Sequence, residues 1–578
     1  MKRSMALLLA VIMIIGLLAG CGSKQSEGEN TSSKSEETTE KQDASQETAA
    51  EQDSKDGVPV SPAGEYPIVS ELTDLEVLIV QLSYKLTDVT TNTFTQELEA
   101  KTNIHLNMNV VPSDSYNEKL NLLLASNDYP EAIMSGGFNN ADLVKYGSTE
   151  GILIPLNDLI DKYCVNIQDR WAENPQFKTQ MTAPDGNIYG IPSSEAKVGH
   201  GAISYKMWMN TTWLETIGKE APQTTQEFYD VLTAFRDQDA NGNGDASDEI
   251  PLTGASGTWA ADPYLYLLNA FGYYTSDIIK LKDGVFTSVA DQDYMKDGLA
   301  YIANLYKEGL LDPASLTQDE TQMSALGNNA DAVIVGAVTC GHLGMCIGIN
   351  DVDRSRQYEA LLPLEGPNGY RGIPGSTTMN VSGAQFVITD VCKNPAMAIR
   401  LADTLCDEEI AVRLNVGIKG MDWDDADSGT IAMDGKTPAT RKYLTYTTSG
   451  EGADRNDIWE NTARLLEPDW KGTFQVVGDI YDPTNYEARL YQETIKLFDY
   501  VADVDQVPAF YVDDDMASAI SQLKTPLSDY VNTSIVEFIT GKKNVENDWD
   551  TYLAGLEKLK YNDYITKMQE AYDYSIGK

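Results

Sequence analysis

The residues best suited to bind an ion lie in one acidic loop, from Asp237 to Glu249 (DQDANGNGDASDE). Oxygen-bearing side chains recur at alternate positions in it, and its glycines allow the tight, positive-φ backbone that wraps around a cation. Ca²⁺ takes about six to eight oxygen ligands from carboxylates, amides and backbone carbonyls. A solvated turn rich in Asp and Asn is the alternative. We expect a calcium site, whose candidate ligands are Asp237, Asp239, Asn241, Asn243, Asp245, Asp248 and Glu249.

This loop departs from the EF-hand pattern, in which a glutamate closes the site at the twelfth position. Counted from Asp237 the twelfth residue is Asp248, and counted from Asp239 it is Ile250. A catalytic metal would need an open coordination position beside a substrate and usually a base, and nothing in the sequence supplies them. We therefore expect a structural ion, which fixes the loop between a helix over 225–236 and a strand that starts near Ile250.

A second set of residues could bind a sugar. Neutral sugars present hydroxyl groups around an apolar ring face, so their sites combine flat aromatic rings with Asp, Asn, Gln or Arg side chains. The candidates are Trp259 in a Gly/Ser-rich loop, Trp423 in a glycine-rich loop, Tyr84 just after the first strand, and Arg371. Core packing is the alternative for each aromatic residue. Three other tryptophans lie on helix-like faces and are assigned to the core: Trp213, Trp459 and Trp549.

Composition bounds the function. The chain has 578 residues, with 43 Lys and Arg against 88 Asp and Glu, and a formal net charge of −45. This charge excludes nucleic acid as a partner, because phosphate binding needs clustered basic residues, and it argues against docking on anionic lipid through a basic surface. With 42% hydrophobic residues the chain can bury a sizeable core. Only three histidines are present, which makes a multi-histidine catalytic metal site a poor explanation.

The N-terminus indicates where the protein goes. A short basic start is followed by a nearly unbroken apolar run from Met5 to Leu18, which is too short for a membrane span and typical of a signal peptide. The run ends in Leu-Ala-Gly-Cys21, which resembles the bacterial lipobox. That resemblance implies cleavage before Cys21 and lipidation of its thiol, which would hold the protein on a membrane. An ordinary secretory peptide that happens to contain a cysteine is the alternative.

A polar tether follows the lipidation residue. From Gly22 to about Glu65 the composition is dominated by Ser, Thr, Glu, Gln, Lys and Ala, with almost nothing to bury. The segment has four Lys and eleven Asp or Glu, and the signal segment has two basic residues, which leaves a net charge of −40 for the rest. No second apolar run approaches 18 residues. The acidity therefore belongs to the part that folds.

The body alternates strands and helices, which predicts an α/β fold with a parallel sheet covered on both faces. Apolar runs predict strands over 75–80, 104–110, 132–134, 331–338 and 385–388. Amphipathic spacing predicts helices over 93–102, 116–126, 156–163 and 395–406 and a helical C-terminus over 547–575.

Several segments carry a resemblance to a known family. These are Leu122–Ile133 (LLLASNDYPEAI), 147–159 (GSTEGILIPLNDL), 183–192 (APDGNIYGIP), Trp213–Glu215 and Phe538–Gly541. In order and spacing they resemble the extracellular solute-binding lipoproteins of carbohydrate ABC importers, which include alginate-oligosaccharide receptors. The resemblance covers nearly the whole body from about Leu75.

The resemblance implies a fold and a task. Family members have a two-lobed periplasmic-binding-protein-like fold (type II), with hinged lobes joined by crossing segments, and they close around a sugar bound in the cleft. They also carry a D-x-N-G-N-G loop with a structural Ca²⁺, which implies that Asp239, Asn241, Asn243 and the Asp248–Glu249 pair ligate and that Asp245 binds through its carbonyl. This copy has one extra residue before the pair, so which acid closes the site stays open. The implied partners are an oligosaccharide ligand, ABC permease subunits and, through the lipid on Cys21, the outer face of the cytoplasmic membrane; we expect a monomer.

The predicted organisation follows from these patterns together. It comprises a signal peptide over 1–20, a lipidated cysteine and tether over 21–65, lobe 1 over 66–204, lobe 2 with the calcium loop over 205–370, a return to lobe 1 over 371–420, and a return to lobe 2 with C-terminal helices over 421–578. A receptor for peptides on the same fold stays open as an alternative. So does a lipid-anchored glycosidase, although the chain has none of the common catalytic motifs, and we expect no enzyme.

Overall fold

The structure is a computed structural model. It describes residues 54–81, 88–194, 201–375, 381–445, 456–457, 459, 462–467, 469–507, 510–576 and 578. The chain divides into two units, residues 1–50 and 51–578, and all described residues belong to the second. The predicted lipidation residue Cys21 and the candidate sugar contact Tyr84 lie outside the described residues.

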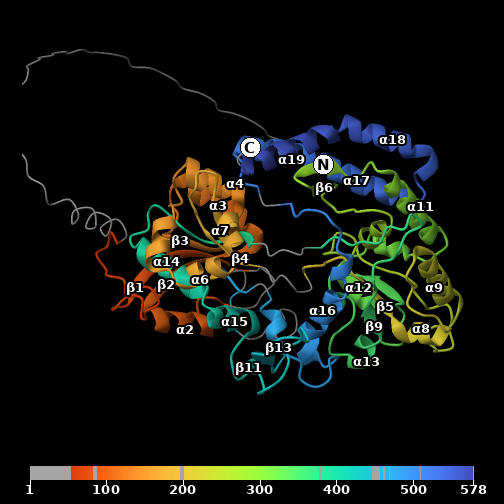
Figure 1. Ribbon diagram of the computed structural model, residues 1–578, viewed down its shortest axis with the longest axis horizontal. Helices are drawn as coiled ribbons and strands as arrows, with labels where there is room; N and C mark the ends of the chain where they lie inside the picture. The colour runs from red at the N-terminus through yellow and green to blue at the C-terminus, as the bar shows by residue number, and fades with distance from the viewer. Residues whose placement is uncertain are drawn as a thin grey trace, which may run out of the picture. The chain divides into compact units, whose positions relative to one another are not determined.

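The first lobe is built on a five-stranded sheet, which we call the sheet lobe (Figure 1). Its strands, in spatial order, are β2 (Ile104–Pro112), β1 (Thr73–Gln81), β3 (Ala132–Phe138), β10 (Val381–Ile388) and β4 (Ile191–Ser194). β1 is parallel to β2 and β3, as predicted, but β10 is antiparallel to both of its neighbours. The sheet is therefore mixed and not parallel throughout. A parallel neighbour usually follows a helix that crosses over the sheet. β10 instead enters the sheet when the chain returns from the other lobe.

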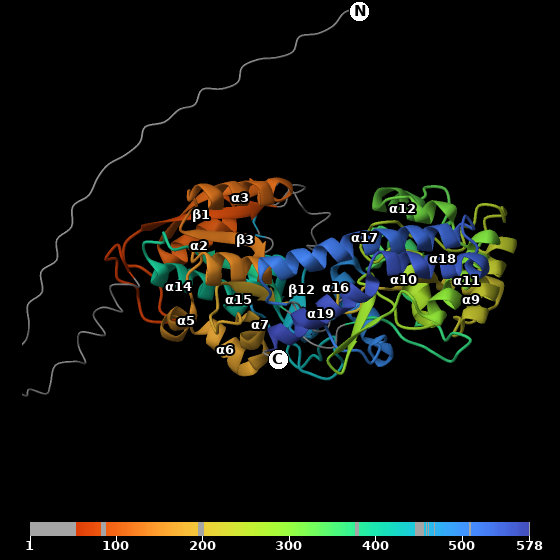
Figure 2. The same cartoon turned by 90° about the horizontal axis from the view of Figure 1, so that it is seen from above.

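Side-chain alternation along β1 separates the two cores of this lobe. Val77 and Ile79 belong to one buried cluster with residues of α2, α5 and α14, whereas Leu78 belongs to another with residues of α3. Figure 2 shows α3 on one side of the strands and α5 on the other. The helices of the lobe are α2 (Thr93–Thr102), α3 (Tyr116–Ser126), α4 (Asn140–Leu143), α5 (Asn157–Tyr163), α6 (Asn166–Glu173), α7 (Pro175–Met181), α14 (Pro395–Leu405) and α15 (Glu408–Val416).

The folded part begins before residue 66, where the sequence places the end of the tether. The backbone N–H of Lys55 donates to the carbonyl of Lys393 at 2.8 Å, and the side-chain amide of Asn394 donates to the carbonyl of Val58 at 3.0 Å. Val60 and Val69 form an isolated antiparallel bridge. These contacts attach the segment over 54–65 to the start of α14. The segment has few large apolar side chains, but its backbone N–H and C=O groups can still form hydrogen bonds with the folded part.

The second lobe is mainly helical, and we call it the helical lobe. Its small antiparallel sheet has the order β8 (Ala337–Thr339), β5 (Met207–Asn210) and β9 (Tyr358–Ala360), and β6 (Ile279–Lys282) pairs with β7 (Val285–Ser288). Its helices are α8 (Thr211–Ile217), α9 (Thr225–Asp237), α10 (Pro263–Leu267), α11 (Asp293–Lys307), α12 (Glu320–Gly327), α13 (Val352–Ser355), α17 (Asp514–Ile539), α18 (Val545–Lys558) and α19 (Tyr561–Ser575). Figure 1 shows α17, α18 and α19 in blue, with α11 beside them, and their buried residues share one core with α9 and α11.

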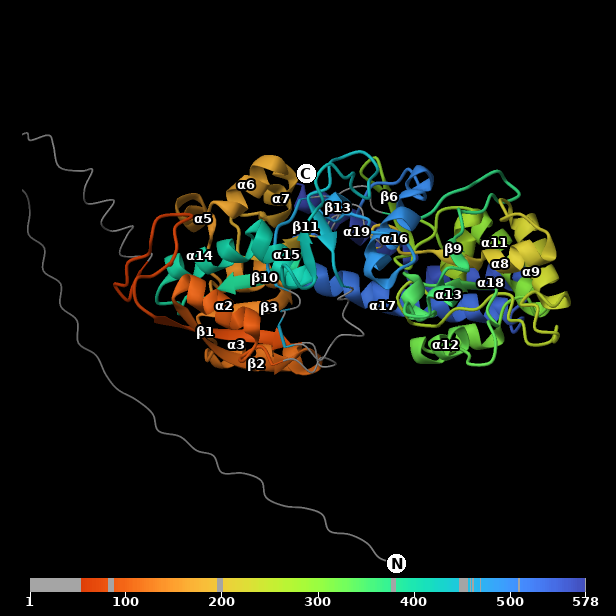
Figure 3. The same ribbon diagram turned by 90° about the horizontal axis from the view of Figure 1, so that it is seen from below.

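Another three-stranded sheet, which we call the third sheet, packs against α15 and α16 (Tyr486–Ile495). It has the order β11 (Trp423–Asp425), β12 (Arg441–Tyr443) and β13 (Phe474–Gln475). Figure 3 shows it between α15 and α16, and one buried cluster contains residues of all of these elements. The chain also crosses between the lobes where Ile373 bridges Val501 and the Gln506 amide donates to the carbonyl of Gly375 at 2.9 Å. Within the described residues, no helix is long and apolar enough to span a bilayer.

Candidate functional site

The acidic loop is held at both ends by regular structure. Its first residue ends α9, which begins with a capping box between Thr224 and Glu227. After the loop, Ile250 bridges Val335 and Thr253 bridges Val338, so the chain joins the edge of β8. The loop therefore lies between the predicted helix and an extended segment, as the sequence indicates.

Backbone donors curl the loop around its own side-chain oxygens. Asp239 Oδ2 accepts from the N–H of Gly244 at 2.9 Å, Asn241 Oδ1 from Asn243 at 2.9 Å, and Asn243 Oδ1 from Asp245 at 2.8 Å. Gly244 has a φ of +92°, which only glycine adopts without strain. Counted from Asp239 as position 1, the glycine stands at position 6 and Asp245 at position 7. These are the EF-hand positions for the sharp turn and the carbonyl ligand.

The two acids at the end of the loop fold back onto its beginning. Asp248 accepts from the side-chain amides of Asn241 at 2.9 Å and Asn243 at 2.7 Å. Glu249 Oε1 accepts from the backbone N–H of Ala240 at 2.9 Å. In the register that starts at Asp239, this glutamate stands at position 11. The spacing is therefore one residue shorter than in an EF-hand, and the Glu249 carboxylate still contacts the start of the loop.

Two carboxylate oxygens in this loop are buried without a hydrogen-bond partner: Asp239 Oδ1 and Glu249 Oε2. Burial also raises the pKa of Glu249. Leaving such oxygens unpaired is costly unless a cation compensates them. The donors are carboxylates, amides and carbonyls, which suit a hard cation such as Ca²⁺. Within the described chain, no group of three or more His, Cys, Asp or Glu side chains gathers as a metal cluster, and here two of the oxygen donors are asparagines.

Two of the predicted ligands have other partners. The guanidinium of Arg236 binds both carboxylate oxygens of Asp237, at 2.7 and 2.9 Å. Asp245 Oδ1 accepts from the hydroxyl of Ser247 at 2.6 Å and from its N–H at 3.1 Å. The side chain of Asp245 thus stabilises the turn, which leaves its backbone carbonyl as the group available to an ion. Asp237 belongs to the end of α9 and not to the interior of the loop.

Trp259 is the best-placed aromatic candidate. Its side chain is 46% exposed, and a Cβ added to Gly341 would lie 2.2 Å from its ring, so the ring rests directly on that glycine. The rings of His342 and Trp259 are 6.2 Å apart, and His342 Nδ1 lies 3.2 Å from the hydroxyl of Tyr486. The ring is therefore supported from the protein side and half-exposed. Burial raises the pKa of the nearby Asp262 to about 6.

Trp423 and Arg371 have the environments of structural residues. Trp423 is 3% exposed and its indole N–H donates to the carbonyl of Gly417 at 3.0 Å, in the cluster around the third sheet. The Arg371 guanidinium lies 4.6 Å from the ring centre of Tyr500, and its Nε donates to the carbonyl of Pro363 at 2.6 Å. Both pack against partners other than Trp259. The core assignments are confirmed, since these side chains are 1–5% exposed: Trp213, Trp459 and Trp549.

The sheet lobe also contains a cavity of about 680 Å³ that is not among the sites predicted from the sequence. It lies where β3 ends, and its walls also come from α7, the start of β10, the end of α19 and the crossing segment, of which Gln506, Val507 and Tyr511 line it. Its polar lining consists of amides and hydroxyls from Asn139, Asn140, Gln176, Thr179, Gln180, Thr182, Gln506, Tyr511 and Ser575. The available signal was the Ser-Gly-Gly-Phe-Asn-Asn run at the carboxyl end of a predicted strand, where ligands bind in α/β sheets.

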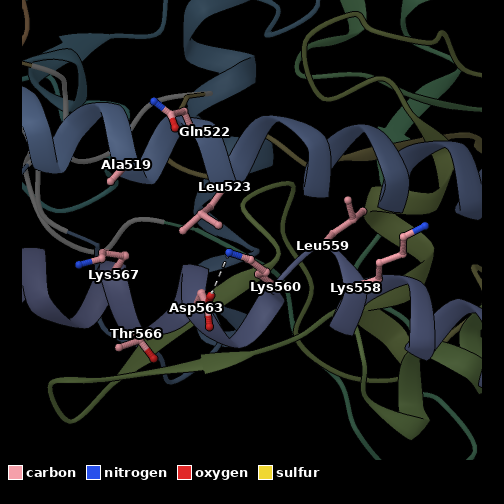
Figure 4. Close-up of a pocket in the computed structure, with 9 residues that line it drawn as sticks. All are labelled: Ala519, Gln522, Leu523, Lys558, Leu559, Lys560, Asp563, Thr566 and Lys567. Carbon is pink, nitrogen blue, oxygen red and sulfur yellow. Dashed lines mark ion pairs between the residues drawn. The ribbon is translucent and has the colours of Figure 1, made fainter.

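A second hollow, of about 590 Å³, lies between α17, α18 and α19 (Figure 4). Its lining side chains, including Lys558 and Lys560, are exposed or half-buried. Lys560 and Asp563 approach to 4.0 Å. Without a buried polar group this hollow is a shallow surface feature and a poor sugar site.

Known proteins resemble the chain over most of its length. The family model for bacterial extracellular solute-binding proteins matches residues 87–343. The fructooligosaccharide ABC transporter substrate-binding protein FusA of Streptococcus pneumoniae serotype 4 is 29% identical over 494 residues, which are 83% of this chain and 86% of FusA. The solved structure of FusA in complex with kestose has a TM-score of 0.70 at 27% identity and covers 87% of this chain and 100% of that one.

Two further structures complete the comparison. An EF-hand mutant of FusA in complex with fructo-nystose matches with the same TM-score, identity and coverage. An extracellular solute-binding protein from Bifidobacterium longum subsp. infantis has a TM-score of 0.72 at 21% identity and covers 87% of this chain and 98% of that one. The predicted two-lobed α/β fold of the type II solute-binding proteins is confirmed.

Proposed function

We propose that the chain is an extracellular solute-binding protein of a carbohydrate ABC importer, which captures an oligosaccharide and delivers it to an ABC permease. The observation that carries the proposal is Trp259, a half-exposed indole seated on Gly341. A flat aromatic ring held in place from behind stacks on the apolar face of a sugar. The similarity to a fructooligosaccharide receptor over most of both chains supports this ligand class over a peptide.

Calorimetry with purified protein tests the proposal. The probes are kestose, nystose, maltotriose, xylotriose and mannotriose, with a tripeptide as the alternative ligand. We expect saturable binding of at least one oligosaccharide and a loss of roughly tenfold to a hundredfold in Trp259→Ala. Leu72→Ala, an exposed apolar residue of the sheet lobe, is the control. Binding of the peptide alone would refute the sugar receptor, and cleavage of the bound sugar during incubation would favour a glycosidase.

The acidic loop is proposed to hold a structural Ca²⁺. Asp239, Asn241, Asn243, Asp248 and Glu249 would supply side-chain oxygens, and Asp245 its carbonyl. The unpartnered oxygens of Asp239 and Glu249 support this assignment, as does the EF-hand mutant made in the similar protein FusA. The ion would neutralise the buried carboxylates and fix the end of α9 against the segment at Ile250. It would take no part in a reaction.

The membrane attachment is proposed from the sequence alone. Lipidation of Cys21 would hold the folded body at the outer face of the cytoplasmic membrane through the acidic tether. A receptor attached in this way stays near its permease while its body moves. Metabolic labelling with a fatty acid tests it: label in the wild type and its loss in Cys21→Ser are the expected result, and label in both would contradict it.

A further inference from the structure

The cavity in the sheet lobe has an unusual composition for this chain. Asp, Glu, Lys and Arg make up 23% of the sequence, yet none of the described residues that line the cavity is charged. Amide and hydroxyl groups supply its polar surface, and they can both donate and accept hydrogen bonds. A neutral polyhydroxyl ligand needs this combination, whereas a carboxylate needs a cation or several N–H donors.

The arrangement of α7 shows how this lining is achieved. Gln176, Thr179 and Gln180 follow the i, i+3, i+4 spacing that places them on one helix face, and all three line the cavity. The cation of the same helix, Lys178, lies over the ring of Trp171, with its Nζ 4.7 Å from the ring centre. The helix therefore presents amides and a hydroxyl to the cavity and directs its one charge elsewhere.

Free hydrogen-bonding groups remain on this face. Gln180 Oε1 accepts from the N–H of Val381 at 3.1 Å, and its carbonyl accepts from the hydroxyl of Tyr511 at 3.0 Å. These bonds anchor the helix to β10 and to the crossing segment. No hydrogen bond joins the side chains of Gln176 or Thr179 to the described protein, so both are available to a ligand. Asp142, the acid of α4, instead accepts from the backbone N–H of Asn139 at 3.2 Å as part of a helix cap.

We propose that this cavity is a subsite for an uncharged sugar residue and that it makes the receptor selective for neutral oligosaccharides over uronic-acid oligosaccharides. The inference rests on the proposed function and deepens it. A uronate that enters the cavity loses hydration and meets no opposite charge, which is costly. The net charge of −45 adds a long-range repulsion against anionic ligands.

The first test compares ligands of equal length on the full folded protein. The neutral probes are kestose, maltotriose, xylotriose and mannotriose, and the charged probe is trigalacturonate, at fixed Ca²⁺ and ionic strength. We expect a neutral trisaccharide to bind at least about tenfold more tightly than trigalacturonate. Equal or tighter binding of trigalacturonate overturns the selectivity while sugar capture stands. If no saccharide binds, the proposed function itself fails.

The second test moves a charge into the cavity. Gln176→Lys and Thr179→Lys should lower the affinity for the neutral ligand and raise the affinity for trigalacturonate. The ratio of the first affinity to the second should fall by roughly tenfold, and Gln176→Glu should raise this ratio. Lys178→Glu is the matched control, since it changes charge on the same helix but away from the cavity, and both affinities should persist. Gln176 and Thr179 are exposed, so the variants should fold, which thermal melting checks. Unchanged affinities in both lysine variants overturn the subsite.

Discussion

The acidic loop and the cavity of the sheet lobe use opposite chemistries. The loop gathers its groups from one short segment, Asp237 to Glu249, and leaves carboxylate oxygens buried without a partner. The cavity draws on β3, α7, β10, the crossing segment and α19, and none of its described lining residues carries a charge. The first arrangement has the oxygen donors that suit the proposed cation, and the second has the uncharged polar groups that suit the proposed neutral ligand. Acidic side chains are thus concentrated in the loop and absent from the described lining of the cavity.

Removing the cation should have the largest effect on stability. We expect a chelator to lower the melting temperature of the wild type by several degrees, because a ligand that binds only the folded state at about 100 times its Kd contributes about 2.7 kcal/mol. Glu249→Gln should melt near the chelated wild type, whether or not Ca²⁺ is present. The control Glu220→Gln, an exposed acid outside the loop, should respond to chelator as the wild type does. Equal melting of the wild type with and without chelator would contradict the calcium assignment.

The partly buried carboxylate of Asp262 lies outside the acidic loop, and its pH dependence gives a comparison with the loop carboxylates. Burial raises the pKa of Asp262 from its usual value near 4 to about 6. The folded state then binds more protons than the unfolded state between about pH 4 and 6, so the free energy of unfolding falls as the pH rises through that range. The loss is on the order of 1–3 kcal/mol and is complete above about pH 6. Denaturant titrations of Asp262→Asn should show a flatter profile across this range, and a slope equal to that of the wild type would contradict the assignment.

The support beneath Trp259 should matter for sugar binding even without a contact to the ligand. Gly341→Ala would place a Cβ 2.2 Å from the ring, so the ring must move, and we expect sugar affinity to fall by roughly threefold to tenfold. The decisive comparison is a double variant. In the Trp259→Ala background the Gly341→Ala change should cost little further affinity, because both changes remove the same platform. Additive losses in calorimetry would mean that Gly341 acts by another route.

Local signals in the sequence predict the position of the acidic loop between a helix and an extended segment, and they predict most of the regular elements. The helices 93–102 and 116–126 agree with α2 and α3 because their periodicity and capping residues are contiguous. The predicted helix over 547–575 is two helices, α18 and α19, which are separated at Lys560. Lys560 has a φ of +63°, and no glycine or proline at this position indicates the break in the sequence. The strand over 331–338 is regular only over 337–339, since its earlier residues pair through isolated bridges.

Tertiary environment decided what the sequence left open. Trp259 and Trp423 both lie in glycine-rich loops, yet the first is 46% exposed and the second is 3% exposed. The difference arises because Trp423 begins β11 and shares a buried cluster with Phe474 and Tyr491, which are distant in sequence. The cavity was missed for the same reason. Its polar groups come from residues 139–182 and from Gln506, Tyr511 and Ser575, more than 300 residues later, so no local pattern unites them.

The smallest expected effect decides the register of the loop. Asp237 is exposed and paired with Arg236, and such surface pairs contribute less than about 1 kcal/mol. If the loop counts from Asp239, as its hydrogen bond from Gly244 indicates, Asp237→Asn should leave calcium affinity and the chelator response unchanged, whereas Asp239→Asn should weaken calcium strongly. Calcium titrations followed by calorimetry measure both variants. A loss in Asp237→Asn as large as that in Asp239→Asn would move the first ligand to Asp237 and break the separation between the end of α9 and the ion site.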